Sequence, residues 1–131
     1  MKRLWILGLL VLIAACAPTT SVSPLSAPER PMNIAPIQID QVEIRLAESF
    51  PVQVFAHVRG VIGDGCSSVL PVTQQRDGNT ITLSINRQRP ADAICTQIAK
   101  LYEENIRLEG DFPAGEYVLK VNDVTQPFTV K

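Results

Sequence analysis

Hydrophobic and polar residues alternate along much of this 131-residue chain. Val42, Ile44 and Leu46 are separated by single charged residues, and the stretch 80–85 alternates between threonine or serine and aliphatic residues. Successive side chains of a strand point to opposite faces, so this period of two predicts strands with one buried face. The expected strands cover seven stretches: 42–46, 52–58, 69–72, 80–85, 102–108, 117–121 and 124–130.

Turn-forming residues separate the expected strands. Asp77-Gly78 predicts a hairpin, because glycine adopts the positive φ of a tight turn, and Asn122-Asp123 predicts a second two-residue turn. Pro127 cannot donate a ladder hydrogen bond, so the last strand is expected at a sheet edge or with this position turned outward. Residues 91–99 fit either a short helix or an irregular crossover. We therefore predict a mostly β fold, an antiparallel β-sandwich of about seven strands.

The segment Phe112-Pro-Ala-Gly-Glu-Tyr117, which opens an alternating strand, resembles the penultimate hairpin of immunoglobulin-like sandwiches. The resemblance implies that Tyr117 forms a tyrosine corner, with its hydroxyl bonded to the main chain just upstream, and that Gly115 allows the chain to turn. Leu119 stands where antibody domains place their second core cysteine. The antibody disulfide is therefore excluded.

Two further motifs carry a second resemblance. Asp64-Gly-Cys66 and the stretch 89–97, Arg-Pro-Ala-Asp-Ala-Ile-Cys-Thr-Gln, taken with the hairpin above, resemble small uncharacterised bacterial envelope lipoproteins with an immunoglobulin-like domain. These proteins bring no known activity that would transfer to this chain.

The N-terminal segment has the layout of a secretory signal peptide. Two basic residues, Lys2 and Arg3, precede an uncharged apolar run over residues 4–15, which is shorter than the roughly 20 residues of a spanning helix. The ending Ile13-Ala14-Ala15-Cys16 resembles the lipobox of bacterial lipoproteins, in which the cysteine is acylated and the chain is cut before it. The resemblance implies a mature chain that starts at Cys16 and is anchored in a membrane by acyl chains such as palmitate. An ordinary signal peptide with a chance cysteine, or an uncut anchor, is the alternative.

The expected location is the cell envelope. Ala17, and not aspartate, follows Cys16. In Gram-negative lipoproteins this resembles the pattern sent to the outer membrane, so the periplasmic face of that membrane is predicted for a Gram-negative source.

Proline is concentrated just after Cys16. Five of the 10 prolines stand at positions 18, 24, 28, 31 and 36, mixed with serine, threonine and alanine. Such a segment buries too little apolar surface to offset its ordering entropy, so it predicts a disordered tether, with a loop packed on the domain as the alternative. The expected organisation is a signal peptide over 1–15, a lipidated N-terminus and tether over 16–36, and one sandwich domain over 37–131.

The two remaining cysteines, Cys66 and Cys95, predict a structural disulfide, because the export signal implies an oxidising compartment. A redox pair usually has Cys-x-x-Cys spacing, and a zinc site would need two more ligands where only His57 exists. Closing a loop of this length stabilises a fold by roughly 3.5 kcal/mol on the chain-entropy model.

Candidate catalytic residues are few. His57, the sole histidine, is expected on the strand face opposite the valines, half exposed. Ser67 and Ser68 have no Gly-x-Ser-x-Gly turn around them. Glu103 and Glu104 are neighbours and would point to opposite faces of a strand, which prevents them from sharing a proton or a metal.

Binding motifs are equally sparse, and we predict no cofactor and no metal. Asp64 is expected in a flexible acidic turn that lacks the further oxygen ligands of a calcium loop. Met32 is the only methionine outside the signal peptide, which excludes a methionine-rich copper site. Arg87, Arg89 and Asp92 are expected at a solvated strand end, with a grip on an anionic partner as the alternative.

Charge argues against two kinds of partner, nucleic acid and anionic lipid. The chain has 12 Lys and Arg against 13 Asp and Glu and a formal net charge of −1, without a basic block. Nucleic-acid binding and electrostatic adhesion to anionic lipid both require clustered Lys and Arg, so neither is expected.

Two classes of function stay open. The first is a non-enzymatic, lipid-anchored envelope protein that binds or scaffolds an envelope protein or polymer, with inhibition of an exported enzyme as a variant. The second is a small hydrolase that uses His57 or the acidic residues. The first class is favoured because the sequence contains no arrangement of residues that is typical of an active site.

Overall fold

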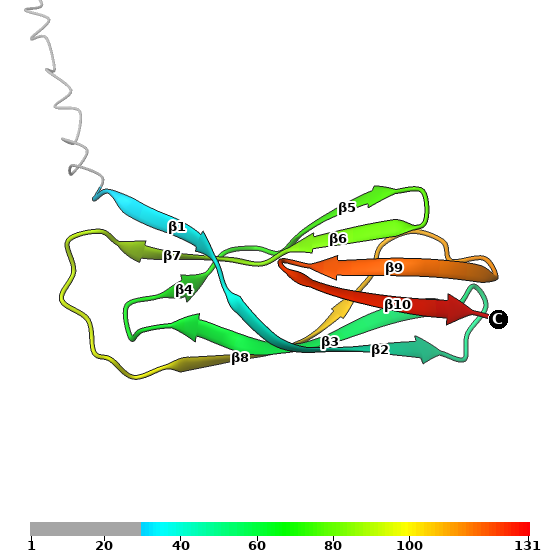
Figure 1. The fold of residues 1–131 in the computed structure, drawn as a ribbon, viewed down its shortest axis with the longest axis horizontal. Coiled ribbons are helices and arrows are strands. Elements are labelled where there is room, and N and C mark those ends of the chain that lie inside the picture. The colour runs from blue at the N-terminus through cyan, green and yellow to red at the C-terminus, as the bar shows by residue number, and fades with distance from the viewer. Residues whose placement is uncertain (1–29) are drawn as a thin grey trace, which may run out of the picture.

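The computed structural model describes residues 30–131 and is all β (Figure 1). Cys16, the predicted signal peptide over 1–15 and most of the predicted tether lie outside the described residues. The ten strands are β1 (Met32–Pro36), β2 (Gln38–Ala47), β3 (Gln53–Gly63), β4 (Ser68–Val69), β5 (Thr73–Asp77), β6 (Thr80–Ser84), β7 (Asn86–Pro90), β8 (Lys100–Arg107), β9 (Gly115–Val121) and β10 (Val124–Val130).

The strands form two layers of an elongated sandwich (Figure 1). One layer is the sheet β2-β3-β8. The other layer consists of two sheets placed end to end, β1-β7-β4 at the end where the described chain begins and β10-β9-β6-β5 at the opposite end. We call these the proximal end and the distal end. The predicted mostly β sandwich is confirmed.

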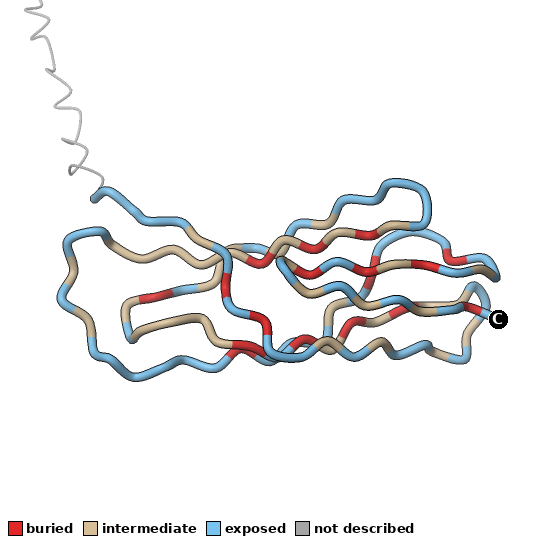
Figure 2. The backbone as a smooth tube through the Cα atoms, in the orientation of Figure 1, coloured by how far each residue is buried: buried red, intermediate tan, exposed pale blue. Residues whose placement is uncertain are grey.

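The core lies between the layers, and Figure 2 shows buried residues along strands of both layers. The predicted inward faces of β3, β6 and β9 are confirmed, and the last strand, β10, lies at a sheet edge as Pro127 required. Leu46 departs from the prediction: it is 44% exposed at the end of the edge strand β2. The fully buried side chains include Ile81, Leu83, Ile85, Leu119, Val54, Val58 and Val121.

Both predicted two-residue turns are present. Asp77 pairs with Thr80 around Gly78, whose φ is +57°, and Val121 pairs with Val124 around Asn122, whose φ is +50°. The stretch 91–99 is irregular and not helical. One strand pair departs from the expected antiparallel arrangement, because β6 runs parallel to β9.

The predicted domain boundary at Ile37 is wrong. Residues 32–36, which were assigned to the tether, form β1 and pair with β7 from Met32↔Pro90 to Pro36↔Asn86. Proline content misled the prediction because an edge strand tolerates a residue that cannot donate a hydrogen bond. β1 is such an edge strand.

Asn122 joins three segments at the middle of the sandwich, where the sheets of the split layer meet. Its side-chain nitrogen donates to the carbonyl oxygens of Ile37 and Ile85, each at 2.9 Å, and its side-chain oxygen accepts the Ile85 N–H at 2.9 Å. Ile37 lies between β1 and β2, and Ile85 lies between β6 and β7. The amide therefore binds the chain at two points where a single residue separates a strand of one sheet from a strand of another.

Tyr117 lies at the distal end with its ring in the core. Its hydroxyl donates a 2.8 Å hydrogen bond to the carbonyl of Pro113, which is the geometry of a tyrosine corner. The ring stacks on Phe128 at 5.3 Å and meets the edge of Phe112 at 5.4 Å between centroids. Gly115 begins β9 two residues earlier.

Replacing the corner hydroxyl should lower stability. Tyr117→Phe keeps the ring but leaves the Pro113 carbonyl without its donor, so we expect a loss of about 1 to 3 kcal/mol in the free energy of unfolding. Tyr117→Ala should cost more, because a cavity is added. Denaturant unfolding of the purified protein measures both. Tyr102→Phe is the matched control, since Tyr102 is also buried but its hydroxyl bonds to no residue within 30–131; equal losses at the two positions would contradict a specific role for the corner bond.

Removing the Asn122 carboxamide should loosen the junction of the sheets. Asn122→Ala leaves the Ile85 N–H and the Ile37 carbonyl without this side-chain partner, and each unsatisfied buried group costs about 1 to 3 kcal/mol. The Ile85 carbonyl keeps its hydrogen bond from the Ile37 N–H at 3.0 Å. We expect a larger loss in unfolding free energy than for Tyr117→Phe, together with faster amide exchange at Ile85. Asn105→Ala, on an exposed position of β8, is the control. An unchanged exchange rate at Ile85 would argue against this role.

Candidate functional site

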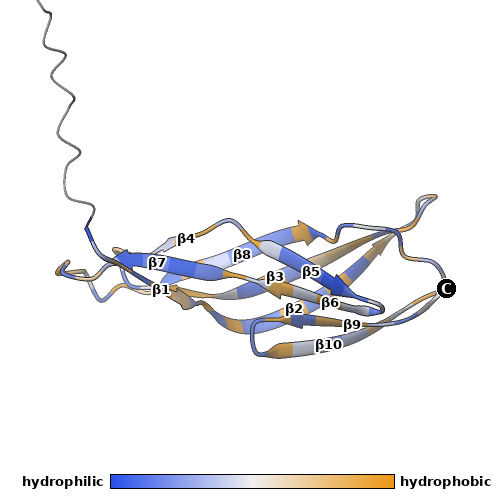
Figure 3. Cartoon of the chain, turned by 90° about the horizontal axis from the view of Figure 1, so that it is seen from above, coloured by the Kyte–Doolittle hydropathy of each residue, from blue (hydrophilic) through white to orange (hydrophobic). Residues whose placement is uncertain are grey.

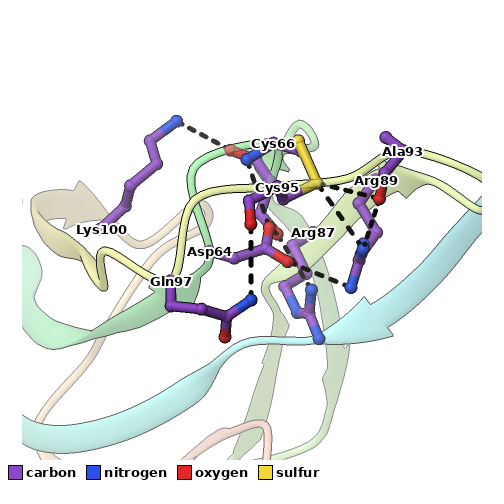
Figure 4. The surroundings of a disulfide bond; sticks show 9 residues. Asp64, Cys66, Arg87, Arg89, Ala93, Cys95, Gln97 and Lys100 are labelled. Carbon is purple, nitrogen blue, oxygen red and sulfur yellow. Dashed lines mark hydrogen bonds and ion pairs between the residues drawn. A yellow bond between two sulfur atoms is a disulfide. The ribbon is translucent and has the colours of Figure 1, made fainter.

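The predicted disulfide is confirmed and lies at the proximal end (Figure 4). Cys66 follows β3 and Cys95 lies in the 91–99 loop, with 5.5 Å between their Cα atoms. The Gly65 N–H also donates to the carbonyl of Thr96 at 3.0 Å. Two loops that are 29 residues apart in the sequence are thus fixed to each other.

Asp64 organises the polar contacts beside the disulfide (Figure 4). One carboxylate oxygen accepts hydrogen bonds from the Ser67 hydroxyl at 2.9 Å and from the Cys66 N–H at 3.2 Å. The other lies 3.1 Å from Arg89 Nη1. The hydrogen bond from Ser67 is the main cause that lowers the pKa of Asp64, with Arg89 and Arg87 contributing, although burial opposes it. The expected flexible acidic turn is in fact a fixed one.

The arginines that were expected at a solvated strand end are engaged in the same cluster. Arg87 Nη1 donates to the Ser67 hydroxyl at 3.0 Å, and the Arg89 side chain is 30% exposed beside Asp64. Lys100 Nζ donates to the Ser67 carbonyl at 2.8 Å. These contacts join the 63–68 loop to β7 and β8, so the cluster holds this end of the sandwich together.

The remaining catalytic candidates are not brought together. His57 on β3 is 17% exposed, and its Nε2 lies 3.2 Å from Glu103 Oε1, which is also 3.9 Å from Arg59 Nε. Ser67 lies in the cluster around Asp64 at the proximal end, and Ser68 is exposed on β4. Burial and the nearby Glu104 raise the pKa of Tyr102 to about 12, so this phenol stays neutral. The pair His57–Glu103 has no nucleophile hydrogen-bonded to it among residues 30–131.

Two features are absent from the part of the chain that the structure describes. Within residues 30–131 no group of three His, Cys, Asp or Glu side chains is placed to hold a metal ion. The same residues include no helix with the length and apolar character to cross a membrane.

An apolar hollow at the distal end was not predicted from the sequence. It has a volume of about 440 Å³ and lies between the 48–52 loop and the 109–114 loop. Phe50 is fully exposed at its edge, with a relative accessibility of 103%. Its lining consists of Phe50, Pro51, Val52, Asp111, Phe112, Pro113, Ala114, Val130 and Lys131.

Strand β5 fixes the loop that forms one wall of this hollow. The Gln74 amide donates to the Glu109 carbonyl at 3.0 Å and accepts the Glu109 N–H at 2.9 Å. Arg76 donates to the Asp111 carbonyl at 2.8 Å, and its guanidinium lies 4.7 Å from the centroid of the Phe112 ring. The wall is therefore preformed, which lowers the entropy cost of binding a partner there.

A larger and more polar groove of about 660 Å³ lies at the middle of the sandwich, beside Asn122. It is lined by Pro36, Ile37, Gln38, Ser84, Asn86, Asn122 and Asp123. The distal hollow is the better candidate, because an exposed aromatic side chain beside an apolar pocket is the usual anchor of a protein interface.

The chain is similar to uncharacterized proteins. The profile of the ORF11 beta-sandwich domain matches residues 56–130. An uncharacterized 10.2 kDa protein in the HgiCIIM 5′ region of Herpetosiphon aurantiacus is 38% identical over 90 residues, 69% of this chain and 96% of that protein. Uncharacterized 10.2 kDa proteins in the HgiBIM and HgiEIM 5′ regions of the same organism are each 36% identical over 78 residues, 60% of this chain and 95% of theirs. No solved structure matches the chain.

Breaking the disulfide should destabilise the domain. Cys66→Ala frees the two proximal loops in the unfolded chain, so we expect a loss of about 2 to 5 kcal/mol in unfolding free energy. Denaturant unfolding with and without a reducing agent measures this. The reductant should lower the stability of the wild type and leave Cys66→Ala unchanged; a wild type that is indifferent to reduction would contradict the prediction.

Stability should also depend on Asp64 at acid pH. Because its pKa is lowered in the folded state, the ionised carboxylate stabilises the fold above the ordinary aspartate pKa of about 3.9, and this contribution disappears as the pH falls below that value. Asp64→Asn should therefore be less stable than wild type at neutral pH, and the difference should shrink towards pH 3. Ser67→Ala removes the hydrogen bond that contributes most to the lowered pKa of Asp64. This variant should also lose stability at neutral pH relative to wild type, by a smaller amount than Asp64→Asn. Parallel wild-type and Asp64→Asn curves would exclude this linkage.

Proposed function

Because this chain belongs to the ORF11 beta-sandwich domain family, whose matched relatives are uncharacterized, we propose a function from its own residues: it is a lipid-anchored envelope protein whose non-catalytic sandwich binds another envelope protein. The anchor is Cys16, and the binding surface is the distal hollow beside Phe50. Where the source is Gram-negative, Ala17 after Cys16 favours the outer membrane.

The anchoring half of the proposal is supported by the sequence of the N-terminal segment. Basic residues, a short apolar run and a small-residue ending before Cys16 occur in the order that lipoprotein processing requires. Two or more acyl chains give stable membrane attachment.

The binding half is carried by one observation, the position of the distal hollow. The two loops that line it lie at the end of the sandwich opposite to the point where the described chain begins (Figure 1). A chain tethered through its N-terminus would present this end away from the membrane. The hollow is preformed by Gln74 and Arg76, and Phe50 offers an aromatic anchor. It therefore suits a partner that presents an apolar side chain.

Processing at Cys16 is tested by Cys16→Ser. The variant should accumulate as an uncleaved precursor without lipid, because the serine hydroxyl does not replace the thiol that is acylated. Electrophoretic mobility and mass spectrometry of the N-terminus measure this. Cys66→Ser makes the same chemical change elsewhere and should be processed normally. An unmodified Cys16 in the mature wild type would refute the anchoring.

Partner binding is tested by pull-down from detergent-solubilised envelopes. The wild type should retain a stoichiometric protein, and Phe50→Ser should weaken it by about 30-fold, the loss typical of an aromatic hot spot. Ile94→Ser is the matched control, since Ile94 is equally exposed at the opposite end. A partner that is unaffected by Phe50→Ser would exclude the distal hollow. Turnover of a substrate panel that is lost in His57→Ala would instead favour a hydrolase.

A further inference from the structure

Two isoleucines of the 91–99 loop are held out in solvent. Ile94 has a relative accessibility of 104% and Ile98 one of 71%. Between them the chain is fixed to the domain by the Cys66–Cys95 disulfide and by the hydrogen bond from Gly65 to Thr96. Apolar side chains displayed in this way mark an interaction surface.

The loop lies at the end where the described chain begins. The Ala91 N–H donates to the carbonyl of Pro31 at 2.9 Å, and Met32 pairs with Pro90. Figure 1 shows the loop between β7 and β8 at the same end as the start of β1, and the hydropathy colouring of Figure 3 shows apolar residues there. Met32 and Ile34 on β1 are also exposed at this end.

The length of chain before β1 limits how far this end can stand from the anchor. Cys16 precedes Arg30, the first described residue, by 14 positions. A chain of this length spans at most about 50 Å when fully extended and about 20 Å as a flexible coil. The proximal end is thus the part of the sandwich closest to a membrane that holds Cys16.

We propose that the 91–99 loop contacts the lipid bilayer, with Ile94 and Ile98 inserted at the level of the headgroups. This inference rests on the lipid anchoring proposed above. Residues 93–99 carry no charge, so they can enter the interfacial region without the cost of desolvating an ion, while Lys100 follows at its edge. The contact orients the sandwich with its proximal end on the membrane and the distal hollow facing away from it.

Tryptophan fluorescence tests this orientation in the full chain. In a Trp5→Phe background, Ile94→Trp and Ile98→Trp each introduce the sole tryptophan. The membrane-anchored variants are reconstituted in phosphatidylcholine vesicles whose acyl chains carry bromine, which quenches nearby indoles. Both should lose about half or more of their fluorescence, because an indole beside lipid sits at the interface. Phe50→Trp, equally exposed at the distal end, is the matched control and should stay unquenched.

The outcomes separate this inference from the anchoring. Acylated protein in which all three variants are unquenched would overturn the membrane contact and leave the anchor intact. Equal quenching of all three would also overturn it, because the sandwich would then have no preferred end towards the lipid. Mass spectrometry of the same samples reports Cys16, and an unmodified thiol would refute the anchoring and this inference with it.

Discussion

The carboxamide of Asn122 satisfies main-chain groups at the place where this sandwich changes sheets. A strand that leaves one sheet for another leaves N–H and C=O groups without ladder partners, and an unpaired group in a half-buried position is costly. Ile37 and Ile85 are two such points, and one side chain serves both. The positive φ of Asn122 places that side chain there, because it lets a tight turn end β9 beside them.

The two ends of the sandwich are stabilised by different physical means. The distal end relies on apolar and aromatic packing, with Phe112, Tyr117 and Phe128 in mutual contact and Arg76 over the ring of Phe112. Strands β4 and β7 at the proximal end have no fully buried hydrophobic residue. There a disulfide and the ion pair between Asp64 and Arg89 hold the loops. A small domain with little core to spare commonly needs such a covalent link.

The sequence predicted those features that depend on local pattern. Alternation predicted the buried faces of β3, β6 and β9, and the dipeptides around Gly78 and Asn122 predicted the turns, because both signals lie within a few neighbouring residues. The engagement of Arg87 and Arg89 could not be predicted in this way, since their partners come from a loop that lies at least 20 residues earlier. The distal hollow forms where the 48–52 and 109–114 loops approach each other. These loops are far apart in the sequence, so no local pattern predicts the hollow. β1 was missed because the prolines around residues 32–36 indicated a tether. Only the pairing with β7 makes this short segment a strand.

The parallel pairing of β6 with β9 has a consequence for the order in which this chain can fold. β6 is an interior strand of its sheet, and it has no neighbour on one side until residues 115–121 are available. The bond from Asn122 to Ile37 joins residues 85 positions apart, so the junction between the sheets also waits for the same late segment. Topologies dominated by such distant contacts fold slowly, because a long loop must lose conformational entropy before the contacts that stabilise it can form. A nascent chain of this design can form neither contact until most of its residues have been made.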